Sequence, residues 1–315
     1  MAMGTLVEVT IFDHPSKSAA AAIDEIESLF ADLETRWDPW EGGELASLNA
    51  KLGSGSKVRP PEDLADLLSR ASHLDEISGG LFEPAIGSLT RLWGFSKEES
   101  TPTSPPSDEA LREQLQAVRP LPQLWLSDDY LQGYQGLAID LGGFAKGEAV
   151  DIAIALLREK GIENAIVNAG GDLRAIGRHG DRDWRIGVRE PRGEGVLAAI
   201  HVSGDESVFT SGDYERFFFA DGRRFHHIID PRDGFPASGT TSVTVIADSA
   251  ALADAAATAI FVAGPDDWTK VAGNLGLTRV MLVDASGTIH MSPEMEARAW
   301  LQGKPAPTVV IEEIP

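Results

Sequence analysis

The alternation of apolar and polar residues at the start of the chain predicts a strand followed by a helix. In residues 6–12, Val7, Val9 and Ile11 alternate with Glu8 and Thr10, which is the period of a strand buried on one face. Apolar residues then recur at helical spacing and form one stripe, and a serine can cap the first turn. The stripe contains Ile23, Ile26, Phe30 and Leu33, and the candidate caps are Ser16 and Ser18.

Proline and glycine mark the ends of two further predicted helices. One opens at Pro61 and runs through an apolar stripe to Gly79 and Gly80. The other covers 150–160 and stops at Gly161. Residues 96–108 are rich in Ser, Pro, Thr and Glu, which predicts a surface loop.

The second half of the chain is rich in short apolar runs bounded by Gly, Pro or Asp, which predict strands. Because several strands follow one another without a helix between them, they cannot be parallel crossovers. We therefore expect an α+β fold, a mixed fold with a largely antiparallel sheet and flanking helices. The predicted strands cover 165–168, 184–188, 198–202, 224–229, 242–246 and 279–283, with helices at 250–262 and 266–275 and a turn at 285–287.

Length and charge limit the classes of function. The 315 residues predict a single domain over 1–315, which could be built as two intimate lobes. The net charge of -22 repels phosphate backbones and anionic membranes, so neither nucleic acid nor a membrane surface is an expected partner. No apolar run reaches the length of about 18 residues that a membrane span needs. As it stands the chain is expected to be soluble and cytoplasmic, unless a signal segment was trimmed.

A glycine and lysine segment at 140–151 is the first candidate site. It reads Asp-Leu-Gly-Gly-Phe-Ala-Lys-Gly-Glu-Ala-Val-Asp and leads into a predicted helix. Glycines and a helix N-terminus allow backbone N–H groups to bind phosphate, and Lys146 adds a full positive charge. The alternative is a plain turn in which Gly142 and Gly143 supply positive φ and Lys146 is solvated.

A second candidate is an acid and a hydroxyl on the helix at 250–262. Asp254 and Thr258 lie four residues apart, so their oxygens share one helix face among alanines. Oxygen ligands of this kind suit Mg²⁺, and phosphate and water would complete the shell. The alternative is an aspartate favoured by the helix dipole and a threonine that bonds back to a carbonyl.

A third candidate is the histidine pair near 227. The run from His226 to Gly234 predicts a strand that ends in a Pro-Arg-Asp-Gly turn, with His227 and Asp230 at its mouth. A histidine can take a proton from a hydroxyl near neutral pH, and a carboxylate can orient it. The alternative is a pair of half-exposed strand residues. Ser211 is expected to position backbone and not to act as a nucleophile.

Two further segments have both a binding and a structural interpretation. Residues 168–172, ending at Asp172, form a glycine turn after an apolar strand and could hold a ligand or only turn the chain. Residues 81–95 place an acid and aromatic residues after a helix stop. A flat ring could stack there, or Trp93 and Phe95 could belong to the core.

Together these segments resemble one family, ApbE, the flavin transferases, over almost the entire chain. The matching blocks, in the family's order, are residues 3–5, 43–49, 82–95, 140–147, 168–172, 210–214, 227–231 and 253–258. The resemblance implies an enzyme with a FAD site in a cleft between two lobes. It implies Mg²⁺-dependent transfer of FMN from FAD to a threonine or serine hydroxyl of an acceptor protein, with release of AMP.

The resemblance also implies roles for individual residues. Gly143, through its carbonyl, Asp254 and Thr258 match the metal ligands, and His227 is the candidate base that Asp230 would orient. The positions that match FAD contacts are Met3, Leu81, Phe82, Glu83, Asp140, Lys146, Asp172, His227 and Ile228. The alternatives are a Mg²⁺-dependent FAD pyrophosphatase and a protein that binds FAD without turnover.

The chain departs from the family's pattern at two places. Glu83 stands where an aspartate is commoner, and the spacing around 37–43 is shifted, so both Trp37 and Trp40 are candidates for contact with the flavin or the adenine. Many members are exported lipoproteins. The acceptor protein is expected to carry a short motif with a serine or threonine.

Overall fold

The chain forms two compact units. The computed structural model describes residues 1–96, 104–127, 129–302 and 307–315. The first, here called the sheet unit, comprises Met1–Leu33, Phe144–Gly212 and Gly239–Pro315. The second, the helical unit, comprises Glu34–Gly143 and Asp213–Ser238. Helix α1 (Ser16–Trp37) begins in the sheet unit and its last turn belongs to the helical unit.

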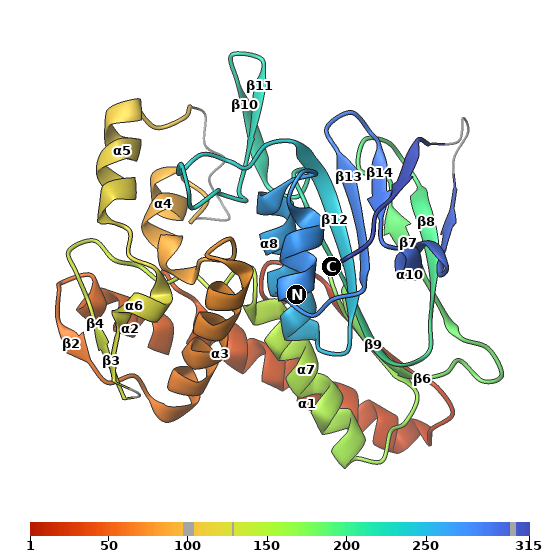
Figure 1. Cartoon of the computed structure of the whole chain (residues 1–315). Helices are drawn as coiled ribbons and strands as arrows, with labels where there is room; N and C mark the ends of the chain where they lie inside the picture. Colours follow the sequence, from red (N-terminus) through yellow and green to blue (C-terminus); the bar gives the residue numbers. More distant parts are fainter. Residues whose placement is uncertain (97–103, 128, 303–306) are drawn as a thin grey trace. The chain divides into compact units, whose positions relative to one another are not determined.

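An eight-stranded sheet forms the centre of the sheet unit (Figure 1). Its order is β1-β5-β6-β9-β12-β13-β14-β16, and all neighbours are antiparallel except β14 and β16. The predicted α+β class with a largely antiparallel sheet is confirmed. The strands are β1 (Val7–Ile11), β5 (Ala165–Ala169), β6 (Asp172–Gly177), β9 (Gly204–Gly212), β12 (Thr240–Ala247), β13 (Arg279–Asp284), β14 (Ile289–Met291) and β16 (Val309–Ile311).

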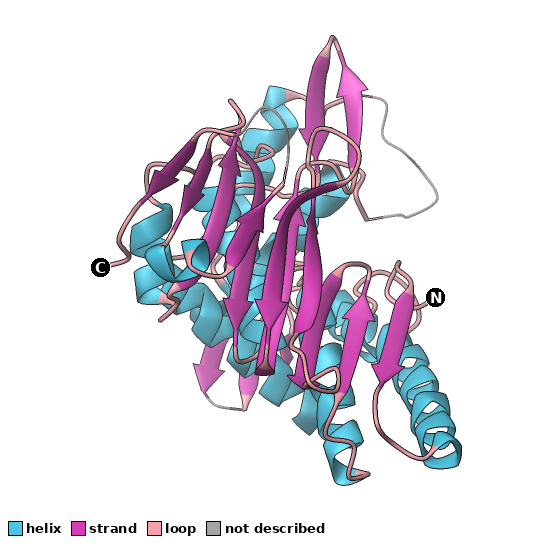
Figure 2. Cartoon of the chain, turned by 90° about the vertical axis from the view of Figure 1, so that its right-hand side faces the viewer, coloured by secondary structure: helices cyan, strands magenta, loops and turns pink. Residues whose placement is uncertain are grey.

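Layers cover both faces of this sheet. Helices α7 (Ala145–Glu159) and α8 (Ala250–Ala263) pack on one face, behind the strands in Figure 2. A three-stranded sheet, β15-β8-β7, packs on the other, and a core of Val, Ile, Met and Trp side chains fills the space between the two sheets. Every residue of β12 is therefore buried. The remaining elements are β7 (Trp184–Arg189), β8 (Val196–Val202), α9 (Trp268–Asn274), α10 (Pro293–Glu296) and β15 (Ala299–Leu301).

The helical unit has its own aromatic core. Trp93 and Phe95 are buried and pack with Phe218 and Phe225, and the Trp93 Nε1–H donates to the carbonyl of Gly234 at 2.8 Å. The core interpretation of Trp93 and Phe95 is confirmed. The elements are α2 (Glu44–Leu52), β2 (Lys57–Val58), α3 (Glu62–Ser78), η1 (Pro84–Ile86), α4 (Gly87–Leu92), α5 (Asp108–Ala117), α6 (Leu121–Leu124), β3 (Trp125–Ser127), β4 (Tyr130–Gln132), β10 (Phe217–Ala220) and β11 (Arg223–His226).

Three details of the predicted elements were wrong. Ile23 is 39% exposed, because Ala22 takes the buried position above Ile26 in α1. The strand expected at 224–229 ends at His226, since the N–H of Asp230 bonds within the turn to the carbonyl of Phe235. The helix expected at 150–160 begins earlier, at Ala145. Most of the loop expected at 96–108 lies outside the described residues, and α5 begins at Asp108.

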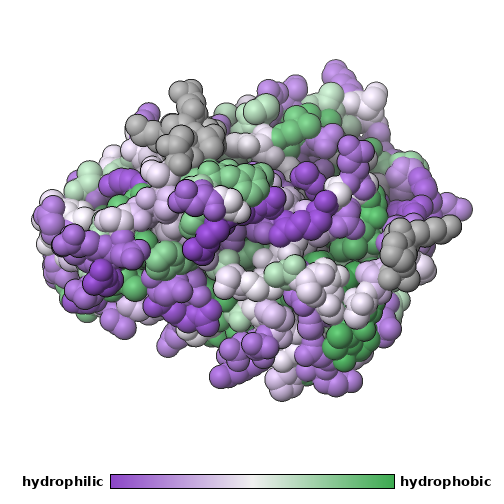
Figure 3. All heavy atoms as spheres, turned by 90° about the horizontal axis from the view of Figure 1, so that it is seen from above, coloured by the Kyte–Doolittle hydropathy of each residue, from purple (hydrophilic) through white to green (hydrophobic). Residues whose placement is uncertain are grey.

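The surface is predominantly hydrophilic on the face that Figure 3 shows, and apolar side chains appear there as separate patches. Within the described ranges, no helix has the length and apolar character that a membrane crossing requires.

Candidate functional site

The site in the sheet unit is a lysine held between two aspartates. Lys146 Nζ, from the first turn of α7, lies 2.8 Å from Oδ2 of Asp172 and 3.2 Å from Oδ1 of Asp254. Asp172 begins β6 and Asp254 lies on α8, and both are buried. The structure thus brings together three residues that the sequence analysis proposed separately. Lys146 and Asp172 were proposed as FAD contacts, and Asp254 as a metal ligand. They are called the carboxylate–lysine cluster below.

Backbone donors fix both carboxylates of the carboxylate–lysine cluster. Asp254 Oδ2 accepts the N–H of Gly147 at 3.0 Å, and Asp172 Oδ1 accepts the N–H of Thr210 at 2.7 Å. Each aspartate therefore uses one oxygen for the backbone and the other for the ammonium group. This arrangement orders the charged atoms before any ligand arrives.

Burial and pairing act in opposite directions on the charges of this cluster. Desolvation lowers the pKa of Lys146, but Asp172 and Asp254 outweigh it and raise the pKa above the ordinary value. Burial raises the pKa of Asp254, and Lys146 opposes that shift. With all three groups ionised the cluster carries a net negative charge, so it favours a further cation.

The glycines before and within α7 have different functions from those expected of a plain turn. Neither Gly142 nor Gly143 has a positive φ. Lys146 is half-buried in ion pairs and not solvated. The plain-turn alternative was wrong on both points. A Cβ on Gly147 would lie 2.3 Å from the carbonyl oxygen of Ala250, so glycine allows α7 to approach α8 closely.

Thr258 lies beside the carboxylate–lysine cluster on α8. Its Oγ1 is 3.3 Å from the carbonyl oxygen of Asp254 and 3.3 Å from Oγ of Ser211. Carboxylate and hydroxyl oxygens are the donors that Mg²⁺ prefers, and the ammonium of Lys146 shows that positive charge is accommodated here. The oxygens of Asp254 and Thr258 are thus of the kind that binds magnesium. In this structure both carboxylate oxygens of Asp254 accept hydrogen bonds, and Thr258 bonds back to a helix carbonyl, as the structural alternative expected. Among the residues that the structure describes, no group of three or more His, Cys, Asp or Glu side chains is arranged for a metal.

A turn next to Asp172 brings the N-terminal segment to the same part of the sheet unit. Gly170 and Gly171 have φ of 71° and 103°, and Asn168 Oδ1 accepts the N–H of Gly171 at 2.8 Å. A Cβ on Gly170 would lie 2.0 Å from Oγ1 of Thr5. Met3, which also has a positive φ of 53°, belongs to the strained segment that packs against this turn.

In the helical unit, Glu83 and Asp140 lie on two backbone segments that run side by side. Glu83 accepts the N–H groups of Ala85 at 2.7 Å and Leu121 at 3.2 Å. The N–H of Asp140 donates to the carbonyl of Pro84 at 2.8 Å. Its Oδ1 accepts the N–H of Gly142 at 2.9 Å, and burial raises the pKa of its carboxyl group. Of the other predicted contacts here, Phe82 is buried and Leu81 is half-buried.

A buried acid pair was missed by sequence analysis. Asp75, on α3, is 1% exposed and shares a hydrogen bond with Glu83. Burial raises the pKa of Asp75 to about 8 and that of Glu83 to about 7. The available signal was an aspartate one helical turn beyond Ala71, within the buried face of the predicted helix.

His227 and Asp230 follow strand β11. His227 Nδ1 lies 3.3 Å from the carbonyl oxygen of Arg216, and its ring meets Phe95 edge-on at 6.4 Å. Asp230 is buried and binds the Arg232 side chain, with Nη2 to Oδ2 at 2.6 Å. Ile228 is buried as well. The proposed orientation of His227 by Asp230 stays a prediction.

The two tryptophans at the shifted spacing differ in accessibility. Trp37 ends α1 and is buried, at 9% exposure. Trp40 is half-buried, and the Arg91 guanidinium lies 5.0 Å from the centre of its ring. Trp40 is therefore the more exposed residue of the two.

Known proteins match this chain along most of its length. The ApbE family model covers residues 3–282. A FAD:protein FMN transferase of Rhodobacter capsulatus is 38% identical over 312 residues, which are 98% of this chain and 60% of that protein. The chain therefore spans 60% of the length of that relative. A FAD:protein FMN transferase of Treponema pallidum (strain Nichols) is 36% identical over 84% of this chain and 77% of its own length.

Solved structures agree with these matches. The ApbE protein from Thermotoga maritima has a TM-score of 0.86 at 34% identity, covering 95% of this chain and 97% of its own. The flavin transferase ApbE from Vibrio cholerae has a TM-score of 0.81 at 26% identity, with the same coverage. The family match, the relatives and the shared fold all agree, and the chain belongs to the ApbE family.

Proposed function

We propose that this chain is a Mg²⁺-dependent FAD:protein FMN transferase. In the proposed reaction, the hydroxyl oxygen of a serine or threonine on an acceptor protein attacks the phosphorus of the FMN phosphate in FAD. The bond from that phosphorus to the bridging oxygen breaks, AMP leaves, and the hydroxyl proton passes to His227. Family membership and the names of the relatives support this activity. The observation that carries it is the carboxylate–lysine cluster beside Thr258.

Each predicted residue has a role in this proposal. Asp254 and Thr258, with the carbonyl of Gly143, would hold Mg²⁺, which supplies neutralisation of pyrophosphate charge when bound. Lys146 provides a positive charge for a phosphate oxygen, and the N–H groups at the start of α7 add partial charge. The remaining FAD contacts are assigned to Met3, Leu81, Phe82, Glu83, Asp140, Asp172 and Ile228.

Substitution of Asp254 tests the metal assignment. We expect Asp254→Asn to slow AMP release about 100-fold or more, because a bound metal supplies several kcal/mol of transition-state stabilisation. AMP release would be measured with FAD and Mg²⁺ in the presence of proteins from the native cell extract. Asp248→Asn removes an exposed charge nearby and should act like the unaltered protein. Unchanged AMP release by Asp254→Asn would refute the assignment.

The same reaction separates transfer from its alternatives. Transfer predicts in-gel flavin fluorescence on an acceptor and a mass gain of one FMN on a serine or threonine peptide. Free FMN and AMP without any modified protein would establish a pyrophosphatase instead. Binding of FAD without release of AMP would establish a non-catalytic protein.

A further inference from the structure

Strand β6 makes two ion pairs of opposite polarity with helix α7. Asp172 and Arg174 are two residues apart on β6, so their side chains lie on the same face of the strand. Asp172 pairs with Lys146 at 2.8 Å, and Arg174 pairs with Asp151 further along α7. The first pair belongs to the carboxylate–lysine cluster, and the second lies about one helical turn further along α7.

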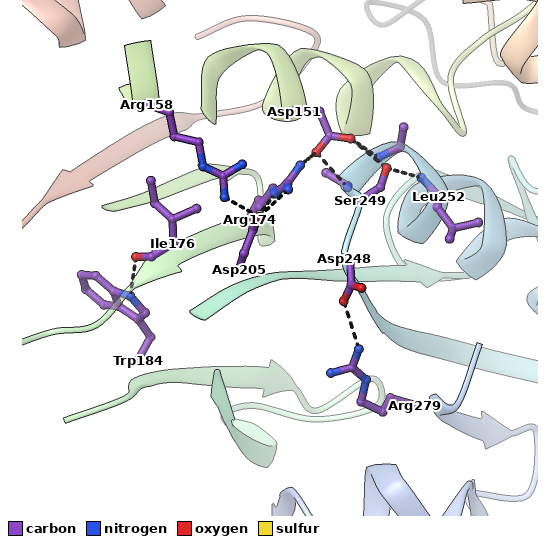
Figure 4. Close-up of polar contacts among 12 residues, drawn as sticks. Asp151, Arg158, Arg174, Ile176, Trp184, Asp205, Asp248, Ser249, Leu252 and Arg279 are labelled. Atoms are coloured by element: carbon purple, nitrogen blue, oxygen red, sulfur yellow. Dashed lines mark hydrogen bonds and ion pairs between the residues drawn. The ribbon is translucent and has the colours of Figure 1, made fainter. Parts of the chain in front are cut away.

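The two α7 residues of these pairs also contact helix α8. Lys146 reaches Asp254 at 3.2 Å. Asp151 accepts the N–H groups of Ala250 at 2.9 Å and Ala251 at 3.1 Å. Asp151 also binds the hydroxyl of Ser249 at 2.9 Å (Figure 4). Its carboxylate therefore caps a helix other than its own, where unpaired N–H groups and the helix dipole favour negative charge.

Arg174 holds Asp151 in place. Its side chain is only 12% exposed and also binds Asp205 of β9 through two bonds, at 2.8 and 2.9 Å. Arg158 of α7 binds the same Asp205 (Figure 4). A bidentate guanidinium–carboxylate pair restricts orientation more than a lysine would.

The contact between α7 and α8 is fixed at two levels. At one, the N–H of Gly147 binds Asp254, and the glycine lies against the carbonyl of Ala250. At the other, one helical turn along α7, Asp151 binds the first residues of α8. Loss of the second level would allow α8 to shift, and Asp254 and Thr258 would shift with it.

We propose that Asp151 is a positioning residue for the transfer reaction, and that Arg174 orients it. Together they fix the start of α8 against α7, so that Asp254 and Thr258 keep the geometry of the ligand site. The inference rests on the proposed function, because its test measures the binding of the metal that the proposed function requires.

Metal affinity, measured well below the unfolding temperature, tests this inference. Mn²⁺ binding to the full chain would be followed by electron paramagnetic resonance for Asp151→Asn and Arg174→Gln. We expect Asp151→Asn to weaken Mn²⁺ binding about tenfold or more, the usual effect of losing a group that orients a ligand. Arg174→Gln should weaken Mn²⁺ binding less than Asp151→Asn does. Because both residues act through one contact, the double variant should lose less affinity than the product of the two single losses.

Two control variants separate positioning from general stability. Asp248→Asn removes a carboxylate next to Ser249 in the sequence. The Asp248 carboxylate pairs with Arg279 at 3.3 Å and not with α7 (Figure 4). Ser292→Ala removes a buried hydroxyl that caps α10 in the same unit, and should lower the melting temperature only. Neither should change the Mn²⁺ affinity.

The outcomes distinguish this inference from the proposed function. Mn²⁺ affinity of Asp151→Asn within twofold of the wild type would overturn the inference and leave the metal assignment intact. An equal loss of affinity in Ser292→Ala would also overturn it, since any destabilisation would then suffice. A wild-type protein that binds no Mn²⁺ would refute the metal assignment, and the inference with it.

Discussion

Individual carboxyl groups in this protein differ sharply in what burial does to them. Asp75 and Glu83 share a hydrogen bond. Burial raises the pKa of both carboxyl groups, and the charge of Glu83 raises that of Asp75 further, whereas the hydrogen bond from Asp75 opposes the rise at Glu83. Asp254 is also buried but lies beside Lys146, and Asp230 is matched by Arg232. Two buried carboxylates in contact are not both ionised at neutral pH.

The acid pair predicts a stability that falls as pH rises. The folded-state pKa of Asp75, about 8, lies above its unfolded value, so folding favours the protonated form. Its contribution is present in acid and is lost as pH rises towards about 8. We expect the free energy of unfolding of Asp75→Asn to exceed that of the wild type, and the difference to be larger at pH 9 than at pH 5. Urea unfolding at both pH values measures this.

An exposed residue of the same helix is the control for the acid pair. Asp66→Asn, on the exposed face of α3, should leave the pH dependence unchanged. Equal pH dependence in wild type and Asp75→Asn would show that Asp75 is not protonated in the folded protein.

His227 gives a prediction about the rate of transfer. We expect His227→Ala to slow AMP release about 100-fold or more, as is usual for loss of a general base, while FAD binding is retained. His201→Ala, an exposed histidine on β8, is the matched control. Full activity of His227→Ala in a stopped-time AMP assay would exclude His227 as the base.

At the scale of elements, the predictions that succeeded are those with an uninterrupted apolar pattern, including the strand at 242–246, which is buried along its whole length as β12. The alternation in β1 and the apolar stripes of α1 and α3 follow from a single buried side. Strands β6 and β9 were not predicted as strands. Both are covered on two sides, and β6 places Asp172 and Arg174 towards α7, so their polar residues interrupt any apolar run.

The close packing of α7 and α8 predicts the effect of one added methyl group. Gly147→Ala would place a Cβ 2.3 Å from the Ala250 carbonyl oxygen, so α8 must move. We expect a loss of about 1–3 kcal/mol in the free energy of unfolding, typical of overpacking. Denaturant unfolding measures it.

A glycine of β7 serves as the comparison for Gly147. A Cβ on Gly187 would meet the Val196 side chain at an ordinary distance of 3.4 Å, so Gly187→Ala should be tolerated. Equal stability of the Gly147→Ala and Gly187→Ala proteins would contradict the close contact.

For the whole molecule, the dominant feature is a net charge of -22. Like charges repel one another in the folded state, and salt screens them. We expect the melting temperature at pH 8 to rise when NaCl increases from about 0.01 M to about 0.15 M. The rise should be smaller at pH 5, closer to the sequence pI of about 4.6. A fall in melting temperature with salt at pH 8 would show that ion pairs outweigh repulsion.

The sequence by itself determined the class of fold, the family blocks and the chemistry that lies along single elements. Asp254 and Thr258 share a face because the helical period places residues four apart together. Only the tertiary structure decided which elements meet. Lys146 lies between Asp172 and Asp254, Asp151 caps α8, and Asp75 joins Glu83, because β6, α7 and α8 pack together in one unit and α3 packs beside η1 in the other. Spacing along the chain carries no information on such contacts, since they depend on how the elements pack.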